Sequence, residues 1–339
     1  MTLPPEPRAN PELVGHDDAA RTLEAAARSG RLHHAWLIAG PPGLGKATLA
    51  FRFARWLLAG LPPAAEGQAP LCLPPAHPVF RRVAGSAHAD LFTLAPSTGD
   101  KGSKLVLRVE DARAAVRFLA HTAAEGGWRV VVVDGAERAD SAAVPNTLLK
   151  TLEEPPPRTV LLVVTSQPDR LLPTLRSRCR RLDLFPLPEP AMALLLGRWQ
   201  PELPPAERAA LARIADGCPG RALTLAEREG LALQAMVDEV LAALPRPDPR
   251  RLHDIADRVA GRRDAAALPV FMALLRRALA AALRQAGRGG AAAPWLGSRA
   301  LADWAALWDR LGRLAEETER LNLDRKQAVL TGLAWLGTR

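Results

Sequence analysis

The sequence contains no tyrosine and very little lysine. Of its 45 lysine and arginine residues, lysine occupies only positions 46, 101, 104, 150 and 326, and alanine is abundant. This composition resembles the residue bias of a GC-rich genome, so the formal net charge of +9 is weak support for nucleic-acid binding. Such a charge permits contact with phosphate groups without establishing it.

Cysteines and long apolar runs are also scarce. The three cysteines, Cys72, Cys179 and Cys218, lie far apart, so they provide neither a disulfide framework nor paired metal ligands, and they fit a reducing cytosol. No apolar run approaches the length that crosses a membrane. The first residues, MTLPPEPRAN, lack a basic-then-apolar targeting pattern. We therefore expect a soluble, cytoplasmic protein without a membrane partner.

The most informative stretch is GPPGLGKAT, residues 40–48. It follows an apolar run at 35–39 that predicts a buried strand. It precedes residues 49–57, where apolar side chains recur at helical spacing. A G-x-x-x-x-G-K motif between a strand and a helix predicts phosphate binding, and a chance glycine-rich turn is the weaker alternative.

The glycines and the lysine of this motif each have a chemical role. Gly40, Gly43 and Gly45 would allow a tight turn whose backbone N–H groups point at the phosphates, and the helix N-terminus would add partial positive charge. Lys46 would place its ammonium group on the terminal phosphates. The sequence therefore predicts that ATP or ADP binds at this loop.

The residue after the lysine departs from the motif. Serine or threonine is normal there, because its hydroxyl binds Mg²⁺, but this chain has Ala47. Thr48 does not replace that hydroxyl, because one helical step rotates a side chain by about 100°. Both residues belong to the predicted nucleotide site, but we expect a weak magnesium site and little or no ATP hydrolysis by the chain itself.

A second part of the predicted site follows the apolar run RVVVVD at 129–134. The run is typical of a strand buried on both faces of a parallel sheet. Asp134 at its tip would occupy the Walker B position, which supports magnesium, although a strand-ending aspartate in a turn is an open alternative. Hydrolysing proteins of this class carry a glutamate next, but this chain has Gly135, and Glu137 lies beyond the strand tip and is assigned no role.

The first half of the chain alternates strands with helices. We predict strands at 35–39, 91–95, 129–134, 160–166 and 182–184, and helices at 19–29, 49–57, 109–122 and 148–154, with a flexible turn at 99–104. This alternation predicts an open, parallel α/β sheet that binds its ligand at the carboxyl ends of the strands. Thr165, at the tip of the fourth strand, is therefore a further candidate for nucleotide contact.

The character of the chain changes after Phe185. Prolines at 186, 188 and 190 mark a linker, and the sequence beyond it is rich in alanine, leucine and arginine at helical spacing. We predict three domains: a P-loop nucleotide-binding domain at 1–186, a small helical domain at 187–233 and a larger helical domain at 234–339.

The order of the motifs resembles a known family. GPPGLGK, VVVVDGAE, NTLLKTLEEPP, VVTSQP, LRSRCR and GCPGRAL are similar to the bacterial DNA polymerase III clamp loader, which belongs to the AAA+ ATPases. LLKTLEEPP followed by SRC is specific to clamp loaders and their relatives. The similarity covers most of the first 230 residues, and NLDRKQAVLTGLAWL resembles the last helix of the collar domain. It implies an AAA+ sheet domain, a helical lid and an all-α collar for oligomerisation.

Two kinds of clamp-loader chain carry these motifs. The motor subunit, gamma/tau, has a complete magnesium site and a catalytic glutamate, whereas the delta-prime subunit has a degraded site and serves as a rigid stator. Ala47 and Gly135 favour the delta-prime kind. The resemblance then implies gamma/tau and delta subunits as partners and, indirectly, the beta sliding clamp and primer–template DNA, because the complex loads the clamp during replication.

The resemblance also assigns a role to Ser177, Arg178 and Cys179. They would form the trans-acting arginine motif, in which Arg178 reaches the ATP site of the neighbouring motor subunit and stabilises charge on the transferred phosphoryl group. From composition alone, the alternative is that Arg178 belongs to a solvated basic edge with the other arginines of RSRCRR.

Two positions depart from the family pattern. Members often carry a four-cysteine zinc module, which would fall between residues 60 and 90, but only Cys72 lies there, so we expect no zinc. The sensor arginine of the motor subunit corresponds to Gly220 in GCPGRAL. Arg221 comes one residue later, on another helix face, so its contact with nucleotide is open.

Three functions follow from these observations. The leading one is a stator subunit that presents Arg178 to a neighbouring ATPase. The second is a gamma/tau-like motor, which would need other residues in place of the missing hydroxyl and glutamate. The third is a DNA-binding module, but no helix-turn-helix or basic stripe interleaved with aromatic residues supports it.

Overall fold

The computed structural model describes residues 4–63, 67–98, 105–139, 141–261, 267–297 and 299–337. The chain forms two compact units. Unit 1 contains Met1–Leu203 and Asp216–Arg221, and unit 2 contains Pro204–Ala215 and Ala222–Arg339. The division into three domains stays a prediction, and the turn predicted at 99–104 lies outside the described residues.

Unit 1 is built on a parallel five-stranded sheet in the order β2-β5-β6-β1-β7. The three inner strands are buried along their whole length, as expected for apolar, β-branched runs between two helical layers: β1 (Ala35–Ala39), β5 (Arg129–Val133) and β6 (Thr159–Thr165). The edges are β2 (Leu91–Leu94) and β7 (Arg180–Asp183). This sheet confirms the predicted α/β, P-loop class of fold.

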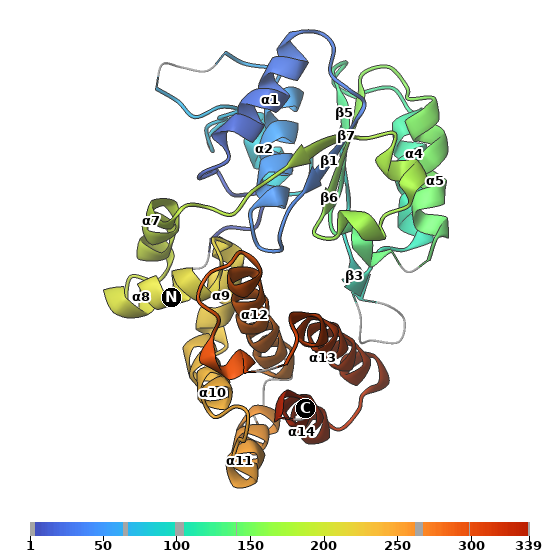
Figure 1. Cartoon of the computed structure of the whole chain (residues 1–339). Helices are drawn as coiled ribbons and strands as arrows, with labels where there is room; N and C mark the ends of the chain where they lie inside the picture. The colour runs from blue at the N-terminus through green and yellow to red at the C-terminus, as the bar shows by residue number, and fades with distance from the viewer. Residues whose placement is uncertain are drawn as a thin grey trace. The chain divides into compact units, whose positions relative to one another are not determined.

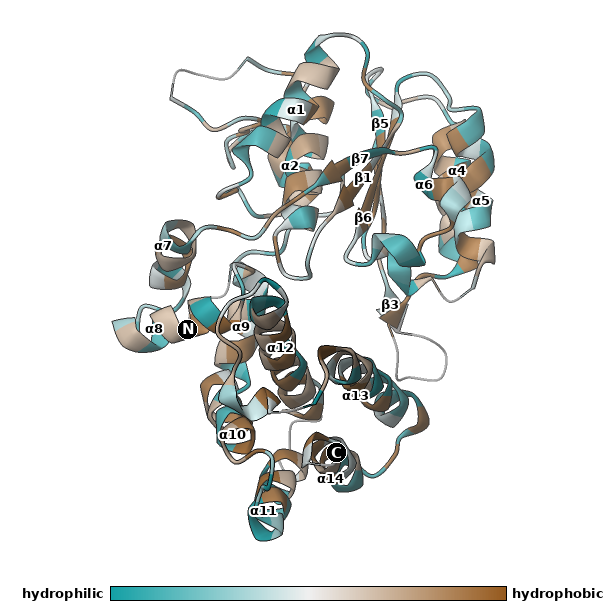
Figure 2. Ribbon diagram, viewed as in Figure 1, coloured by the Kyte–Doolittle hydropathy of each residue, from teal (hydrophilic) through white to brown (hydrophobic). Residues whose placement is uncertain are grey.

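The helices of unit 1 cover both faces of the sheet (Figure 1). Helices α1 (Asp17–Arg28) and α2 (Lys46–Leu58) lie on one face, and α4 (Val109–Ala120) and α5 (Ala143–Glu153) lie on the other. Figure 2 shows apolar residues concentrated on the inner strands. One core consists of residues from β1, β5 and β6 packed against apolar side chains of α4 and α5.

Several short elements were not predicted. They are α3 (Pro78–Ala84), β3 (Ser97–Thr98), β4 (Leu105–Val106), η1 (Ala136–Arg138), η2 (Pro168–Arg170) and α6 (Pro173–Arg176). Helix α3 begins in a proline-rich stretch that resembles a loop, because His77 accepts a hydrogen bond from the N–H of Val79 at 3.2 Å and Pro78 suits the first helical position. Helix α7 (Glu189–Trp199) completes the unit.

Two buried arginines of α2 fasten the N-terminal segment to unit 1. Arg55 donates to the carbonyl oxygens of Arg8 and Asn10 at 2.6 and 2.7 Å, and Arg52 donates to that of Pro11 at 2.7 Å. Burial lowers the pKa of Arg55 to about 10. The helix that starts at the phosphate loop is therefore anchored in its second half.

Unit 2 is helical. Its elements are α8 (Pro205–Ile214), most of α9 (Pro219–Glu227), α10 (Gly230–Ala242), α11 (Pro249–Ala260), α12 (Ala267–Gly287), η3 (Pro294–Leu296), α13 (Leu301–Leu321) and α14 (Arg325–Gly337). Helices α12 and α13 are joined by Arg276, whose guanidinium lies 3.9 Å from the ring centre of Trp308, while the Trp308 indole donates to the Arg276 carbonyl at 2.9 Å. Among the described residues, no helix is both long and apolar enough to cross a membrane.

Candidate nucleotide site and arginine motif

The predicted phosphate loop joins the end of β1 to the start of α2. Gly45 caps α2 with a φ of +97°, and Gly43 has a φ of +75°, both in the region that favours glycine. A Cβ atom at Gly43 would lie only 2.6 Å from the backbone nitrogen of Arg221. Gly40 is equally confined, since its Cβ would meet the Leu184 carbonyl oxygen at 2.7 Å. The loop therefore has the backbone shape that its glycines predict.

Lys46 is buried at the centre of this site. Its Nζ donates to the carbonyl oxygen of Pro41 at 2.7 Å and to the hydroxyl of Ser166 at 3.1 Å. Burial lowers the pKa of Lys46, and the carboxylates of Glu137 and Asp134 oppose that effect. The ammonium group is thus fixed between the loop and the tip of β6, where it can meet an anion.

Two carboxyl groups lie at the strand tips beside Lys46. Asp134 follows β5 directly, as predicted, and burial raises the pKa of its carboxyl. Glu137, which is assigned no role from the sequence, accepts a hydrogen bond from the hydroxyl of Thr165 at 2.8 Å. Glu137 lies beyond the tip of β5, as expected, and the one-turn helix η1 bends the chain back so that its side chain reaches the tip of β6.

The segment Asp216–Arg221 closes over the phosphate loop within unit 1. The N–H of Gly220 donates to the carbonyl oxygen of Gly43 at 2.8 Å, and a Cβ atom at Gly220 would lie 2.9 Å from the Gly43 Cα. The side chain of Arg221 instead pairs with Asp216 at 3.4 Å. It is therefore the backbone at 220–221 that meets the loop, and a nucleotide contact from the Arg221 side chain stays a prediction.

The remaining residues around the phosphate loop include predicted and unpredicted ones. Ala47 and Thr48 lie in the first turn of α2, after Lys46, so the methyl group of Ala47 stands where the motif has a hydroxyl. Sequence reasoning missed His16, a buried side chain whose Nε2 lies 2.9 Å from the Leu44 carbonyl oxygen of the loop. It also missed the Ser166–Lys46 bond, although hydroxyls at the tip of β6 were a usable signal.

His16 gives the site a testable dependence on pH. Burial lowers the pKa of His16, and also of His34 and His88, in the folded chain. As the pH falls below about 6.5, these histidines therefore become protonated in the unfolded chain at a higher pH than in the folded chain. Stability is therefore lost as the pH falls from about 6.5 through the lowered folded pKa values. We expect the urea midpoint to fall between pH 7.5 and 5.5, and to fall less in His16→Gln. An equal fall in both proteins would contradict the assignment to His16.

The arginine motif lies at the opposite end of β7 from the strand tips. The Ser177 hydroxyl donates to the Thr174 carbonyl oxygen at 3.1 Å. Cys179 packs against the core, and burial raises the pKa of its thiol to about 12, so it is an apolar anchor rather than a nucleophile. Arg178 stands between them, with about a third of its side chain exposed, and pairs with Glu153 at 2.7 Å.

The neighbouring arginines have partners of their own. Arg176 pairs with Asp169 at 3.0 Å, and Arg181 pairs with Asp183 at 2.9 Å. The guanidinium of Arg180 lies 4.9 Å from the ring centre of Trp36, and β7 begins at Arg180 and not at 182 because its pairing with β1 starts at these two residues. Each arginine of the run RSRCRR therefore has a contact of its own, although Arg180 and Arg181 are exposed, and the role of Arg178 stays a prediction.

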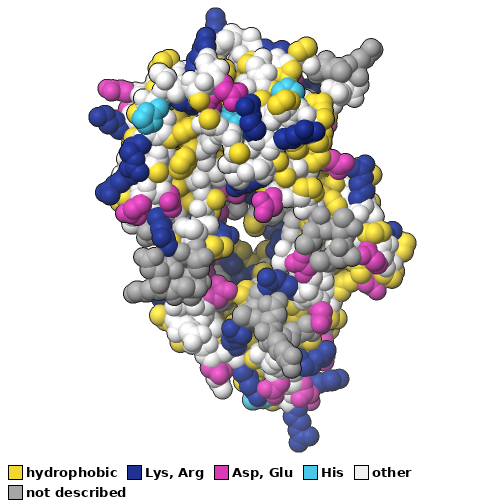
Figure 3. Space-filling view, turned by 180° about the vertical axis from the view of Figure 1, so that it is seen from behind, with side chains coloured by type: hydrophobic (Ala, Val, Ile, Leu, Met, Phe, Trp, Pro, Cys, Tyr) yellow, Lys and Arg dark blue, Asp and Glu magenta, His cyan; other side chains and the backbone are white. Residues whose placement is uncertain are grey.

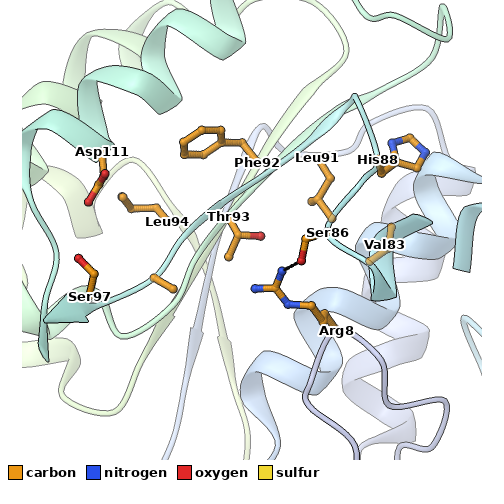
Figure 4. Close-up of a pocket in the computed structure, with 11 residues that line it drawn as sticks. Arg8, Val83, Ser86, His88, Leu91, Phe92, Thr93, Leu94, Ser97 and Asp111 are labelled. Carbon is orange, nitrogen blue, oxygen red and sulfur yellow. Dashed lines mark hydrogen bonds between the residues drawn. The ribbon is translucent and has the colours of Figure 1, made fainter. Parts of the chain in front are cut away.

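A separate cavity of about 430 Å³ lies along β2, at the edge of the sheet away from β7 (Figure 4). Arg8, which donates to the Ser86 hydroxyl, lines one part of it, and Ser97 and Asp111 line another. Among the described residues, none of the predicted site residues lines this cavity. It is distinct from both the phosphate loop and the arginine motif.

A cluster of three residues of the kinds that bind metal ions lies near the cavity. One possible ligand atom from each of His88, Asp90 and Glu125 lies within 4.8 Å of the others. Their hydrogen bonds do not suit a metal ion, however. Arg82 occupies both oxygens of Glu125, at 2.9 and 3.0 Å. The Nδ1 atom of His88 accepts from the N–H of Asp90 at 3.2 Å, which leaves the proton on Nε2. A cation would meet a guanidinium and a protonated nitrogen here.

This chain is similar to known subunits of DNA polymerase III. The family model described as "DNA polymerase III, delta subunit" matches residues 15–188. The delta' subunit of Escherichia coli is 38% identical over 223 residues, covering 65% of this chain and 62% of that protein. The delta' subunit of Pseudomonas aeruginosa is 39% identical over 189 residues, covering 55% and 53%. A gamma/tau subunit of Mycobacterium tuberculosis is 30% identical over 194 residues, covering 57% and 31%. The matched region thus spans less than two thirds of each of these relatives.

Proposed function

Because the chain belongs to the DNA polymerase III delta' family, we propose that it is a stator subunit of a clamp loader. In this role it joins gamma/tau and delta subunits in the cytoplasm, presents Arg178 to a neighbouring ATP site, and helps the assembly load the beta clamp onto primed DNA. Its own ATPase activity is absent or very weak. The similarity of residues 15–188 to the delta subunit family supports this assignment over a gamma/tau motor.

The observation that carries the proposal is a phosphate loop that keeps its lysine and lacks its catalytic groups. Lys46 is held by the carbonyl oxygen of Pro41, whereas Ala47 supplies no hydroxyl for magnesium. Gly135 stands where a motor has glutamate and has a φ of +66°, with Pro96 only 3.3 Å from a Cβ atom placed there. A glutamate at 135 would be strained, so the local backbone itself disfavours a hydrolytic site.

The residues present fit the phosphates of ATP or ADP better than they fit magnesium. The loop, the N-terminus of α2 and the Lys46 ammonium group would hold the phosphates. Asp134 could meet a metal ion, but burial favours its neutral form, and the alanine beside Lys46 removes the other protein ligand. Bound nucleotide would supply a fixed anion at the centre of the unit, without turnover.

Arg178 is the residue that would act on the neighbouring ATPase. It is held at the edge of unit 1 by Ser177 and Cys179, which fix the backbone on either side. A guanidinium in such a position stabilises charge that develops on a transferred phosphoryl group, because it is always charged and presents several N–H donors.

The variant Ala47→Thr distinguishes the stator from the motor alternative. If the missing hydroxyl limits magnesium binding, the variant should bind ADP roughly tenfold more tightly in Mg²⁺, with no change in EDTA, and should still turn over no ATP because residue 135 remains glycine. Titration calorimetry and an ATPase assay on the isolated chain would measure both. Appreciable turnover by the isolated wild-type chain would favour the motor instead.

Assembly provides the broader test of the proposal. The purified chain, mixed with the delta and gamma/tau subunits of the same organism, should elute with them as one complex on size-exclusion chromatography. A chain that elutes alone would contradict the stator role.

Steeply salt-dependent DNA binding by the isolated chain would support the DNA-binding module instead. On the face in Figure 3, basic side chains lie scattered among acidic and apolar ones, which does not favour that function.

A further inference from the structure

The ion pair between Glu153 and Arg178 joins two sequence motifs that the proposed function leaves separate. Glu153 is the last residue of α5, within TLLKTLEEPP, and Arg178 lies in SRC. The Arg178 Nη2 atom lies 2.7 Å from Oε1 of Glu153. We infer that Glu153 is a positioning residue for Arg178. This inference rests on the proposed role of Arg178 as a donor to a neighbouring ATP site.

The guanidinium is held at two points. Its Nη1 donates to the carbonyl oxygen of Thr174 at 3.0 Å, while Nη2 meets Glu153. A guanidinium is planar and carries five N–H donors, so these two contacts fix the plane of the group and account for two donors. The remaining donors can be presented to a phosphate in a defined direction.

The two anchors come from different elements that pack together. Thr174 belongs to α6 and Glu153 to the end of α5. Both helices are labelled in Figure 2. Helix α5 in turn packs on the core through Leu148 and Leu152. The direction of the Arg178 side chain is therefore set by the sheet-bound helix α5 as well as by its own short helix.

The location of Glu153 is unfavourable for a carboxylate in general. It lies at the C-terminal end of α5, where the helix dipole disfavours negative charge. The side chains of Glu153 and Arg178 are 49% and 36% exposed, and ion pairs this exposed contribute little to stability. The pair is thus poorly explained as a stabilising contact and well explained as an orienting one.

Restricting Arg178 in advance would help the reaction in the partner. A long, exposed arginine samples many rotamers, and ordering it at the moment of reaction lowers the rate. If Glu153 orders it beforehand, its removal should reduce turnover by less than the loss of Arg178 itself. An amide at 153 could still accept the hydrogen bond from Nη2.

The test uses the reconstituted complex with clamp and primed DNA, and reads kcat and KM for ATP. We expect Glu153→Ala to lower kcat by roughly tenfold with an unchanged KM, and Glu153→Gln to restore most of it. Glu154→Ala removes the same charge one residue later and should match the wild type. In an Arg178→Ala background, Glu153→Ala should have no further effect, because its effect passes through Arg178.

Other outcomes distinguish the positioning role of Glu153 from the stator role of the chain. Wild-type turnover by Glu153→Ala, with a large loss in Arg178→Ala, would overturn the positioning role and leave the stator proposal standing. An equal loss from Glu153→Ala in both backgrounds, with a lowered melting temperature, would overturn it in favour of a structural role. If Arg178→Ala itself has no effect, the proposed function fails first.

Discussion

Replacing Arg178 with alanine is expected to lower ATP hydrolysis at the neighbouring site by ~10³ or more, the range typical of arginine fingers. The side chain is exposed enough to reach a partner and is held in one orientation by Glu153 and Thr174. DNA- and clamp-stimulated turnover of the reconstituted complex measures the effect. Assembly should be unchanged, because the substitution removes no buried group.

The matched control is Arg176→Ala, two residues earlier in the same run. Arg176 has a similar exposure, 34% of its side chain, and like Arg178 it pairs with an acidic residue of the same unit, Asp169, but it lies outside the Ser177-Arg178-Cys179 motif. We expect it to leave turnover near the wild-type value. An equal loss in both variants would indicate that the basic charge of the run matters and that no single arginine acts on the partner.

The second large effect is a loss of stability expected from Gly43→Ala. Its Cβ would lie 2.6 Å from the backbone nitrogen of Arg221 at a φ of +75°, so the phosphate loop and the segment 216–221 must separate. Overpacking and left-handed strain together should reduce the free energy of unfolding by about 3–5 kcal/mol. Urea denaturation followed by circular dichroism measures the loss.

Gly126→Ala separates the two causes of that loss. Gly126 has nearly the same φ, +71°, but nothing lies within 4 Å of a Cβ atom placed there. It should therefore show the strain alone, about 1–2 kcal/mol. If the two variants lose the same stability, the close approach of the loop to residues 220–221 adds no cost, and strain accounts for the whole loss.

The sheet could be predicted from the sequence because its physical signal is local. The run at 130–133 consists of four valines, β-branched and apolar, which leaves a strand buried on both faces as the natural structure. The phosphate loop could be predicted equally well, since its glycines and Lys46 have fixed spacing. The strand at 180–183 was harder to predict, because it begins with two charged residues, Arg180 and Arg181, and is held by its parallel pairing with β1, where Arg180 lies opposite Trp36.

The rest of the site depends on contacts between distant segments. Glu137 meets Thr165 only because β5 and β6 lie side by side in one register, with Val133 opposite Val163. His16 meets Leu44 across 28 residues, and nothing near it in the sequence indicates a partner. The Gly43–Gly220 hydrogen bond joins residues farther apart still. A single sequence does not specify such pairings.

The central claim is that hydrolysis occurs on the neighbour while this chain supplies Arg178. The most direct test measures ATP turnover side by side for the isolated chain, the wild-type complex and the complex carrying Arg178→Ala. The account predicts no turnover above background by the isolated chain, stimulated turnover by the complex, and a sharp loss with Arg178→Ala. Turnover by the isolated chain, together with an unaffected Arg178→Ala complex, would contradict it and identify the chain as a working motor.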